Sequence, residues 1–377
     1  MNTKKIHLSL LLCCIFSFDL FSQNIEQLKL KAEYLNDSQA QNELGVAYET
    51  GTNVQKDLYK AYRWYRKAAN NNNTHACYNL ARMYHYGIGI DIDVSEAIYW
   101  YKKATKNNLS LANLALGEIY YNGSYVAKNY NIAVSYLKDA AFQGETEGMY
   151  YFACCYAYGR GVPQDSTKAL LWLNRAIDGK YYQAYWMRGV MYEMGLSVAK
   201  NDSISALYYQ IGSSHNVASC QNSIAIYYLE GRGVSVDTAK AIYYFEKSAN
   251  NGNQYAQLNL ADAYKDGSGV QKNEEKAFYW IQKSANQGNK HALNSLAYCY
   301  AQGTGTPVDF DKALTTIDKA ISRYPNDPNL LDSKGEILWM KGKRKEAKKI
   351  WLKIKTIAPQ YYEDNNTQLN KYMQETD

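Results

Sequence analysis

Glycine pairs of the form Gly-x-Gly, at residues 159–161 and 267–269 among others, are the first candidates for chemistry in this sequence. Such loops can cradle phosphate groups, because glycine lets backbone N–H groups approach the phosphate oxygens closely. A phosphate site of this kind also needs the Lys-Ser/Thr of a P-loop or the preceding strand of a dinucleotide fold, and the sequence has neither. We therefore interpret the pairs as turns, with phosphate binding as the alternative.

Catalytic and metal-binding motifs form a second class of candidates. The sequence contains no Gly-x-Ser-x-Gly elbow, no His-Glu-x-x-His motif and no cluster of paired carboxylates. The pairs Asp91-x-Asp93 and Asp309-x-Asp311 lack the glycine and the glutamate of a calcium loop. We therefore predict that the protein is not an enzyme and that it holds no metal ion and no cofactor.

Cysteine is the remaining residue type that often carries chemistry. Two of the seven cysteines lie near the N-terminus. The other five are Cys77, Cys154, Cys155, Cys220 and Cys299. An odd set at irregular spacing argues against a disulfide framework, and the lack of a Cys-x-x-Cys pair argues against a zinc site. We predict small, buried thiols.

The elements that would position any site repeat with a period of 36 residues. Glycine recurs at Gly51, Gly87, Gly123, Gly159, Gly195, Gly231, Gly267 and Gly303. Tyrosine recurs at Tyr48, Tyr84, Tyr120, Tyr156, Tyr192, Tyr228, Tyr264 and Tyr300. Small residues recur at Ala40, Ala76, Ala112, Gly148, Ala184, Cys220, Ala256 and Ala292. Small side chains let neighbouring helices approach closely, so the last set predicts helix-crossing points.

Each unit predicts two helices and no strand. In the first helix, Ala40, Leu44 and Ala47 lie on one face of a 3.6-residue helix, and a glycine such as Gly51 ends it. An apolar stripe marks the second helix, with arginine and lysine facing water. Residues that can cap the second helix are Asp57, Asp165 and Asn273.

Arg188 breaks the pattern of the first helix. The equivalent residues in the other units are Leu44, Leu80, Leu116, Phe152, Ile224, Leu260 and Leu296. A charge in a core position costs several kcal/mol unless it is paired or its side chain reaches water. We interpret Arg188 as a local flaw, with a functional irregularity between the fourth and sixth units as the alternative.

Taken together, the registers read A-x-x-x-L-G-x-x-Y-x-x-G-x-G-V followed by K-A-x-x-W-Y-x-K-A-A-x-x-G, and residues 257–288 nearly spell this pattern. The pattern resembles the Sel-one-like repeat, a relative of the tetratricopeptide repeat. The resemblance covers residues 38–326 as eight repeats of 36 residues. It implies an all-α, right-handed α-α superhelical solenoid of helix-turn-helix repeats.

The N-terminus has the layout of a signal peptide. Lys4 and Lys5 precede an almost wholly apolar stretch, residues 6–18, which is too short for a membrane-spanning helix. We predict a signal peptide over residues 1–22, and therefore an exported protein that is periplasmic or extracellular. A lipid anchor on Cys13 is the alternative.

The two ends of the repeat array predict caps. Residues 23–37 place apolar residues one period before the second helix of the first repeat, which predicts an N-terminal capping helix. Residues 327–359 resemble one tetratricopeptide unit, and residues 360–377 predict a polar C-terminal cap or tail. Stacked arrays require such caps, because each end otherwise exposes an apolar face.

The concave surface of such a solenoid, lined by the first helices, is the predicted partner site that the resemblance implies. First-helix residues outside the core registers vary between repeats, and aromatic residues among them supply large contact area at low entropic cost. These residues are Tyr78, Arg82, His85, Glu118, Tyr121, Tyr150, Trp186 and Glu193. The alternative is that Tyr150 and Trp186 only pack against the next repeat.

Charge and hydropathy limit the classes of partner that the protein can bind. The net charge of +6 is diffuse, unlike the concentrated positive stripe of a nucleic-acid binder, and no segment is apolar enough to span a membrane. The resemblance implies a non-enzymatic scaffold or adaptor that binds a protein or peptide. The alternative is an enzyme that acts on cell-wall precursors or β-lactams, like Cys-rich relatives of the repeat, although this chain lacks their regular Cys pair.

Overall fold

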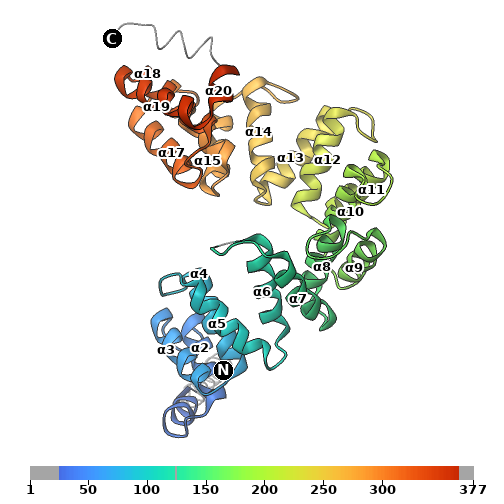
Figure 1. Ribbon diagram of the computed structural model, residues 1–377, viewed down its shortest axis with the longest axis vertical. Coiled ribbons are helices and arrows are strands. Elements are labelled where there is room, and N and C mark those ends of the chain that lie inside the picture. The colour runs from blue at the N-terminus through green and yellow to red at the C-terminus, as the bar shows by residue number, and fades with distance from the viewer. Residues whose placement is uncertain (1–24, 124, 365–377) are drawn as a thin grey trace, which may run out of the picture. The chain divides into compact units, whose positions relative to one another are not determined.

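The computed structural model describes residues 25–123 and 125–364, and every regular element in these ranges is an α-helix (Figure 1). A helix over residues 25–34 comes first. It is followed by α2 (Ser38–Thr50), α3 (Leu58–Asn70), α4 (Thr74–Tyr86), α5 (Val94–Thr105), α6 (Ser110–Asn122), α7 (Tyr130–Phe142), α8 (Thr146–Tyr158), α9 (Ser166–Asp178), α10 (Gln183–Met194), α11 (Asp202–Ser214), α12 (Ala218–Glu230), α13 (Thr238–Asn250), α14 (Gln254–Asp266), α15 (Glu274–Asn286), α16 (Lys290–Gln302), α17 (Phe310–Arg323), α18 (Pro328–Met340), α19 (Arg344–Ile357) and α20 (Pro359–Asp364). The predicted all-α fold is confirmed.

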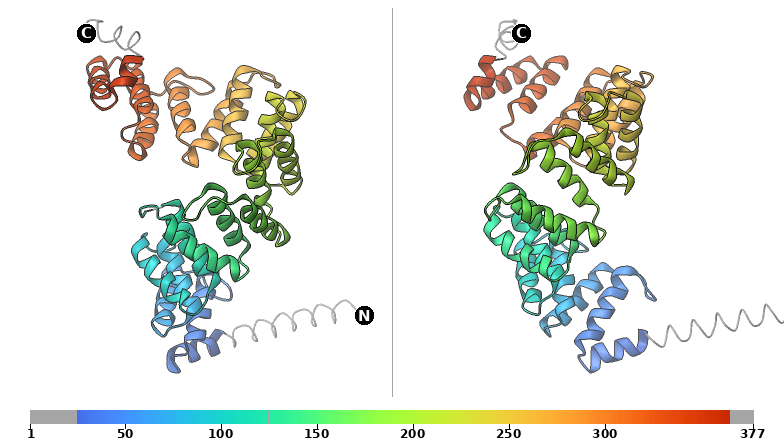
Figure 2. Two further views of the ribbon diagram at one scale, coloured as in Figure 1. Left: turned by 45° about the vertical axis from the view of Figure 1, so that its right-hand side comes forward. Right: turned by 90° about the vertical axis from the view of Figure 1, so that its right-hand side faces the viewer.

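Each repeat contributes a first and a second helix that pack against each other, as α2 does with α3 and α14 with α15. The second helix of a repeat also packs on the first helix of the next, as α3 does on α4 and α13 on α14 (Figure 2). This arrangement is a solenoid, because each helix pair buries its apolar face mainly against its neighbours in sequence.

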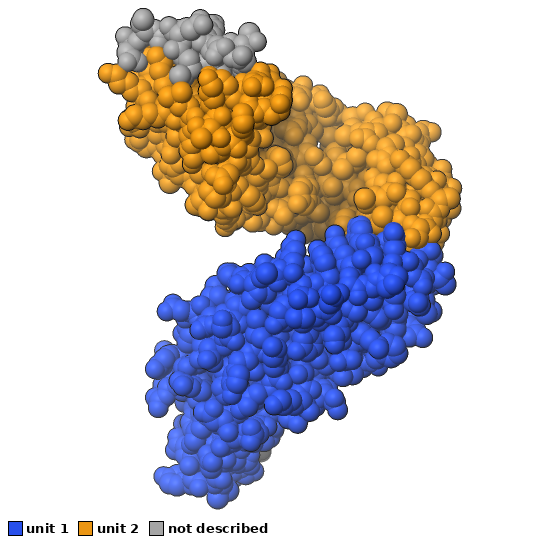
Figure 3. Space-filling view, viewed as in Figure 1, with its two compact units in different colours: residues 1–184 blue, residues 185–377 orange. Residues whose placement is uncertain are grey.

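The chain divides into two compact units, residues 1–184 and 185–377, which Figure 3 shows in different colours. The first unit holds the helices up to α9. The second unit holds α11 to α20, and the boundary falls near the start of α10.

Capping residues and glycines set the helix ends where the sequence predicts them. The carboxylates of Asp57 and Asp165 accept hydrogen bonds from the backbone N–H groups of Lys60 and Lys168, at 2.8 and 2.9 Å. Equivalent caps recur at the start of the second helices. Gly51 ends α2 in the left-handed region with φ +79°, a conformation that costs other residues more.

The second glycine of a Gly-x-Gly pair allows two backbones to approach closely. A Cβ atom on Gly161 would lie 2.4 Å from the carbonyl oxygen of Tyr130, the first residue of α7, and Gly161 also has φ +72°. The close contact and the positive φ explain why glycine occurs at this position, in agreement with the interpretation of these pairs as turns.

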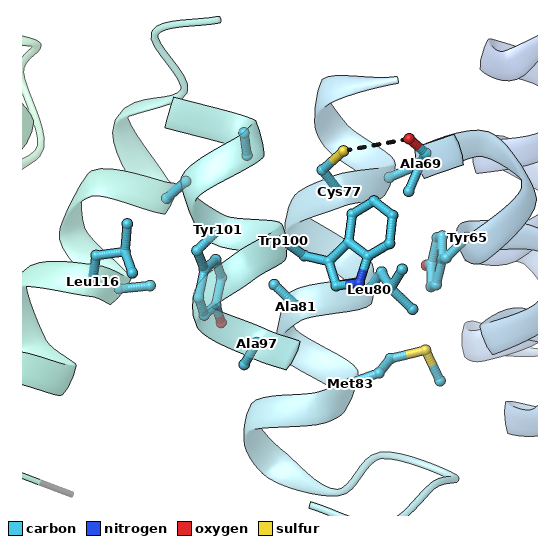
Figure 4. Packing of buried hydrophobic residues seen from close by; sticks show 14 of the residues in the cluster. Tyr65, Ala69, Cys77, Leu80, Ala81, Met83, Ala97, Trp100, Tyr101 and Leu116 are labelled. Atoms are coloured by element: carbon cyan, nitrogen blue, oxygen red, sulfur yellow. Dashed lines mark hydrogen bonds between the residues drawn. The ribbon is translucent and has the colours of Figure 1, made fainter. Parts of the chain in front are cut away.

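Large side chains from both helices of each repeat fill the core. In the first unit, Leu80 of α4, Trp100 of α5 and Leu116 of α6 are buried in one cluster (Figure 4). The five cysteines of the described region are free and buried, which confirms the prediction of buried thiols. The thiol of Cys77 points to the carbonyl of Ala69, at 3.8 Å.

Both ends of the described region cover the repeats beside them. The helix over residues 25–34 buries Ala32, and the carbonyl of Ala32 accepts a 3.0 Å hydrogen bond from Gln41 of α2. At the other end, α19 buries Trp351, which donates a 2.9 Å hydrogen bond to Asp332 of α18. The predicted signal peptide, Cys13 and residues 365–377 lie outside the described residues. Among the described helices, each is too short or too polar to cross a membrane.

Candidate functional site

The eight predicted site residues occupy three equivalent positions of the first helices. These positions are represented on α4 by Tyr78, Arg82 and His85, which are four and three residues apart and therefore lie on one side of the helix. We call this side, together with the adjacent position of Tyr86, the first-helix face. The face recurs on α6, α8 and α10, which carry the other predicted residues.

On α4, Arg82 is held by the preceding repeat. Its guanidinium forms an ion pair with Glu49 at the end of α2. The other carboxylate oxygen of Glu49 accepts a 2.8 Å hydrogen bond from the phenol of Tyr65, which is almost fully buried. The three side chains thus connect two repeats, and Arg82 has a structural partner within the chain.

His85 and Tyr78 belong to an aromatic group around Tyr101 of α5. The ring of Tyr78 lies 5.7 Å from that of Tyr101, and the imidazole of His85 stacks on Tyr86 at 4.3 Å. Burial lowers the pKa of His85, and its Nδ1 atom has no hydrogen-bond partner among the described residues. Tyr86 itself is 58% exposed, so its ring is accessible to solvent.

Glu118 of α6 lies in a mostly aromatic environment. Burial raises its pKa to about 7, and the nearby charge of Glu147 on α8 adds to this effect, while a hydrogen bond from Tyr151 lowers the pKa. Glu147 in turn accepts a 3.0 Å hydrogen bond from the phenol of Tyr181. The site therefore combines two carboxyl groups with several phenols.

Tyr121 and Tyr150 are held within the first unit. The phenol of Tyr121 accepts a 2.6 Å hydrogen bond from Arg160 in the turn after α8. Tyr150 is only 8% exposed, and its ring packs 5.3 to 5.4 Å from those of Tyr151 and Tyr181. Little of the Tyr150 side chain is therefore exposed to a partner.

In the second unit, α10 carries Trp186 and Glu193. The indole N–H of Trp186 donates a 3.2 Å hydrogen bond to Ser223 of α12. Glu193 accepts a 2.5 Å hydrogen bond from the buried Tyr209 and a 3.0 Å bond from Arg232. Both residues thus contribute to contacts between helices.

Arg188 is accommodated by an aromatic ring. Its guanidinium lies 4.2 Å from the centre of the Tyr208 ring and donates a 2.5 Å hydrogen bond to the Tyr208 hydroxyl. A cation over an aromatic face with a charge-assisted hydrogen bond offsets part of the desolvation cost. The local irregularity predicted at Arg188 therefore has a structural solution in this tyrosine.

Comparison with known protein families decides the identity of the repeats. A family model for the Sel1 repeat matches residues 38–73, 74–109, 110–144, 146–181, 183–217, 218–253, 254–289 and 290–315. The chain belongs to the Sel1 repeat family. The resemblance predicted from the repeat pattern is thereby confirmed.

Solved structures of Sel1-repeat proteins agree with this assignment. A protective antigen present in uropathogenic Escherichia coli strains, described as displaying an SLR fold, is 33% identical, with 89% of this chain and 72% of that chain covered and a TM-score of 0.54. A Sel1 repeat protein from Oxalobacter formigenes is 24% identical, with 81% and 90% covered and the same TM-score of 0.54. The search of curated proteins gives no match.

The Sel1 repeats also contain residues that contact the predicted site residues but were not predicted from the sequence. Glu49, Arg160 and Arg232 take part in the contacts of the predicted residues, as do Glu147 and Tyr181. A signal for the two arginines existed, because both follow the glycine that ends a first helix, two repeats apart. Within the described ranges, no group of three or more His, Cys, Asp or Glu side chains is arranged to hold a metal ion.

Proposed function

We propose that this Sel1-repeat chain is a scaffold that binds a protein or peptide on its first-helix face and performs no catalysis of its own. Proteins of this family are generally protein-interaction scaffolds, and the fold of the chain is that of the family. More specifically, we assign partner binding to the first-helix face.

One observation carries this proposal. On α4 and α6, the exposed ring of Tyr86 lies in a group that also contains Tyr78, His85 and the partly desolvated Glu118. A rigid aromatic surface beside a carboxyl group provides both contact area and a polar anchor, which is the composition of binding hot spots. Caps and turn glycines recur in nearly every repeat, whereas the positions of Tyr78 and Tyr86 carry tyrosine in only one other repeat, at Tyr150 and Tyr158.

The experiment compares two tyrosines of the first unit. Tyr86 on the first-helix face and Tyr99 on the second helix α5 are 58% and 52% exposed. We expect Tyr86→Ala to reduce the capture of binding partners from cell extracts and Tyr99→Ala to leave it unchanged, with equal helix content by circular dichroism. Equal capture by both variants would contradict the proposal.

We also propose that the chain is exported. The basic Lys4 and Lys5 followed by apolar residues 6–18 support this proposal, as does the description of the Escherichia coli relative as a protective antigen. Cell fractionation with N-terminal sequencing tests it. A shortened chain in the envelope or medium is expected, and a full-length cytoplasmic chain would contradict it.

The enzyme alternative depended on relatives whose repeats carry a regular pair of cysteines. The five cysteines of the described region are free, buried and irregularly spaced. No specific observation within that region favours the alternative over the scaffold.

A further inference from the structure

A cavity of about 400 Å³ lies between α12 and α14 in the second unit. Its volume falls within the range of about 300–1,000 Å³ that is usual for ligand pockets. Ile226, Leu229, Ile242 and Phe245 supply its apolar wall. Two of these residues come from the first-helix face of α12 and two from α13, the helix between α12 and α14 in sequence (Figure 1).

Three other grooves between successive first helices contain an arginine of the chain itself. Between α10 and α12, the guanidinium of Arg232 donates hydrogen bonds to Glu193 and Asp202, at 3.0 and 3.2 Å, and lies 4.3 Å from the centre of the Tyr227 ring. The groove is thereby filled by a cation between carboxylates and an aromatic ring.

Two grooves of the first unit follow the same principle. Between α2 and α4, Arg82 forms an ion pair with Glu49. Between α6 and α8, Arg160 lies 4.4 Å from the centre of the Tyr158 ring and donates to the phenol of Tyr121. Three grooves thus take an arginine side chain, although the arginines come from two different positions of the repeat.

The groove between α12 and α14 has no arginine at either position. Ser268 stands where Arg160 and Arg232 stand in their repeats, and Asp262 stands at the position of Arg82. These two replacements remove the internal cation, and Ser268 and Asp262 both line the cavity.

The residues that would receive an internal arginine have changed as well. Leu229 occupies the position of Glu49 and Glu193, and Phe245 occupies that of Tyr65 and Tyr209. The carboxylate and phenol found in the α2–α4 and α10–α12 grooves are therefore replaced by apolar groups that form the cavity wall.

Carboxylates stand at the rim of this cavity without an internal arginine between them. Asp262 and Asp266 line the cavity and have no ion pair within the described region, whereas Glu230 is 3.4 Å from Arg232. Surrounding protein raises the pKa of Asp262, an effect that the charge of Lys265 partly opposes. An additional cation at the rim would meet two carboxylates that have no ion pair within the described region, beside one lysine.

We propose that this cavity receives an arginine side chain of a partner protein, with its methylene groups along Phe245 and its guanidinium at Asp262 and Asp266. This inference rests on the proposed function, because the cavity is lined by residues at first-helix-face positions of α12 and α14. Arginine fits better than lysine, since its planar guanidinium binds carboxylates in a forked geometry and stacks on aromatic rings.

The test uses the full chain and three blocked fluorescent hexapeptides that differ only in a central arginine, lysine or citrulline. Citrulline has nearly the shape of arginine but no charge. We expect the arginine peptide to bind at least about tenfold more tightly than the other two, as is usual for a lost charge-assisted contact. Binding of the lysine peptide with equal affinity would overturn the assignment to arginine.

Two cavity variants and one control variant locate the binding. Asp262→Asn should weaken binding of the arginine peptide by about tenfold. Glu275 is an exposed carboxylate on α15, and Glu275→Gln should leave the affinity for this peptide unchanged. Ser268→Arg restores the arginine of the equivalent turns, and we expect it to occupy the cavity, abolish peptide binding and raise the melting temperature. Unchanged binding by both cavity variants would overturn the inference.

The test of this inference can fail independently of the test of the proposed function. If the arginine peptide does not bind but Tyr86→Ala still reduces partner capture, the inference about the cavity fails and the scaffold proposal stands. If the peptide binds at the cavity and Tyr86→Ala has no effect, the proposed role of the first unit fails instead.

Discussion

Tyr209 donates a 2.5 Å hydrogen bond from its buried phenol to Glu193 on the first-helix face, and Tyr65 makes the equivalent bond to Glu49 four repeats earlier. In both places, a second helix anchors a carboxylate at the end of the first helix of the same repeat. The predicted binding face is therefore tied to the core by specific polar contacts, so we expect its residues to contribute to stability.

Removing one of these phenols should destabilise the protein. Tyr209→Phe deprives Glu193 of a donor, and the loss of a bond to a charged group costs about 1–3 kcal/mol. Urea unfolding should show this decrease in the free energy of unfolding. Tyr255→Phe, at a tyrosine that is 57% exposed, should change it by less than about 0.5 kcal/mol.

Gly189 should not tolerate a methyl group. In most helices Gly→Ala stabilises by up to about 1 kcal/mol, because alanine restricts the unfolded chain. At Gly189, however, a Cβ atom would lie 2.2 Å from the ring of Tyr209. We expect Gly189→Ala to destabilise by about 1–3 kcal/mol in thermal unfolding, as overpacked sites do. An increase in stability would show that the ring moves aside without cost.

Stability should depend on pH through Glu118. Its pKa rises from a usual value of 4.5 to about 7 in the folded chain, so the folded state binds this proton more tightly than the unfolded state. The resulting stabilisation is complete below about pH 4.5 and is lost as the pH rises through about 7.

The measurement is the free energy of unfolding at about pH 5 and pH 8. We expect Glu118→Gln to reduce the difference between the two values by about 1–3 kcal/mol. The exposed Glu33→Gln serves as the control and should keep the wild-type difference. If Glu118→Gln also keeps it, Glu118 titrates at its usual pH in the folded chain.

The buried cysteines should be inert in the folded chain. Burial raises the pKa values of Cys154 and Cys155 to about 12, so the reactive thiolate is scarce near neutral pH. Alkylation followed by mass spectrometry should find both thiols unmodified in the native protein and modified in denaturant. Rapid native labelling would mean that α8 opens locally.

The sequence predicts most of the backbone because stacking constrains it. Every repeat must present the same caps and close approaches to its neighbours. The roles of Asp57 as a helix cap and of Gly51 as the residue that ends a helix could therefore be predicted from their period alone. The contacts of long side chains follow no such constraint. Arg82 reaches back to Glu49 from a helix, whereas Arg232 reaches back to Glu193 from a turn.

The burial of Tyr150 could likewise not be predicted from the sequence. A tyrosine at its position is half-buried in α4 but buried in α8, because Tyr151 and Tyr181 surround it there. Only the neighbouring repeat determines whether such a ring is available to a partner, and period and composition do not contain that information.

Site-specific photo-crosslinking would show which face of the repeats contacts a partner. A photoreactive amino acid is placed at Tyr86 or Met194, which are exposed on the first-helix face, or at Tyr99 or Leu171, which are exposed on second helices. We predict crosslinks to one partner from the first pair and none from the second. Crosslinks from the second-helix positions alone would contradict this prediction.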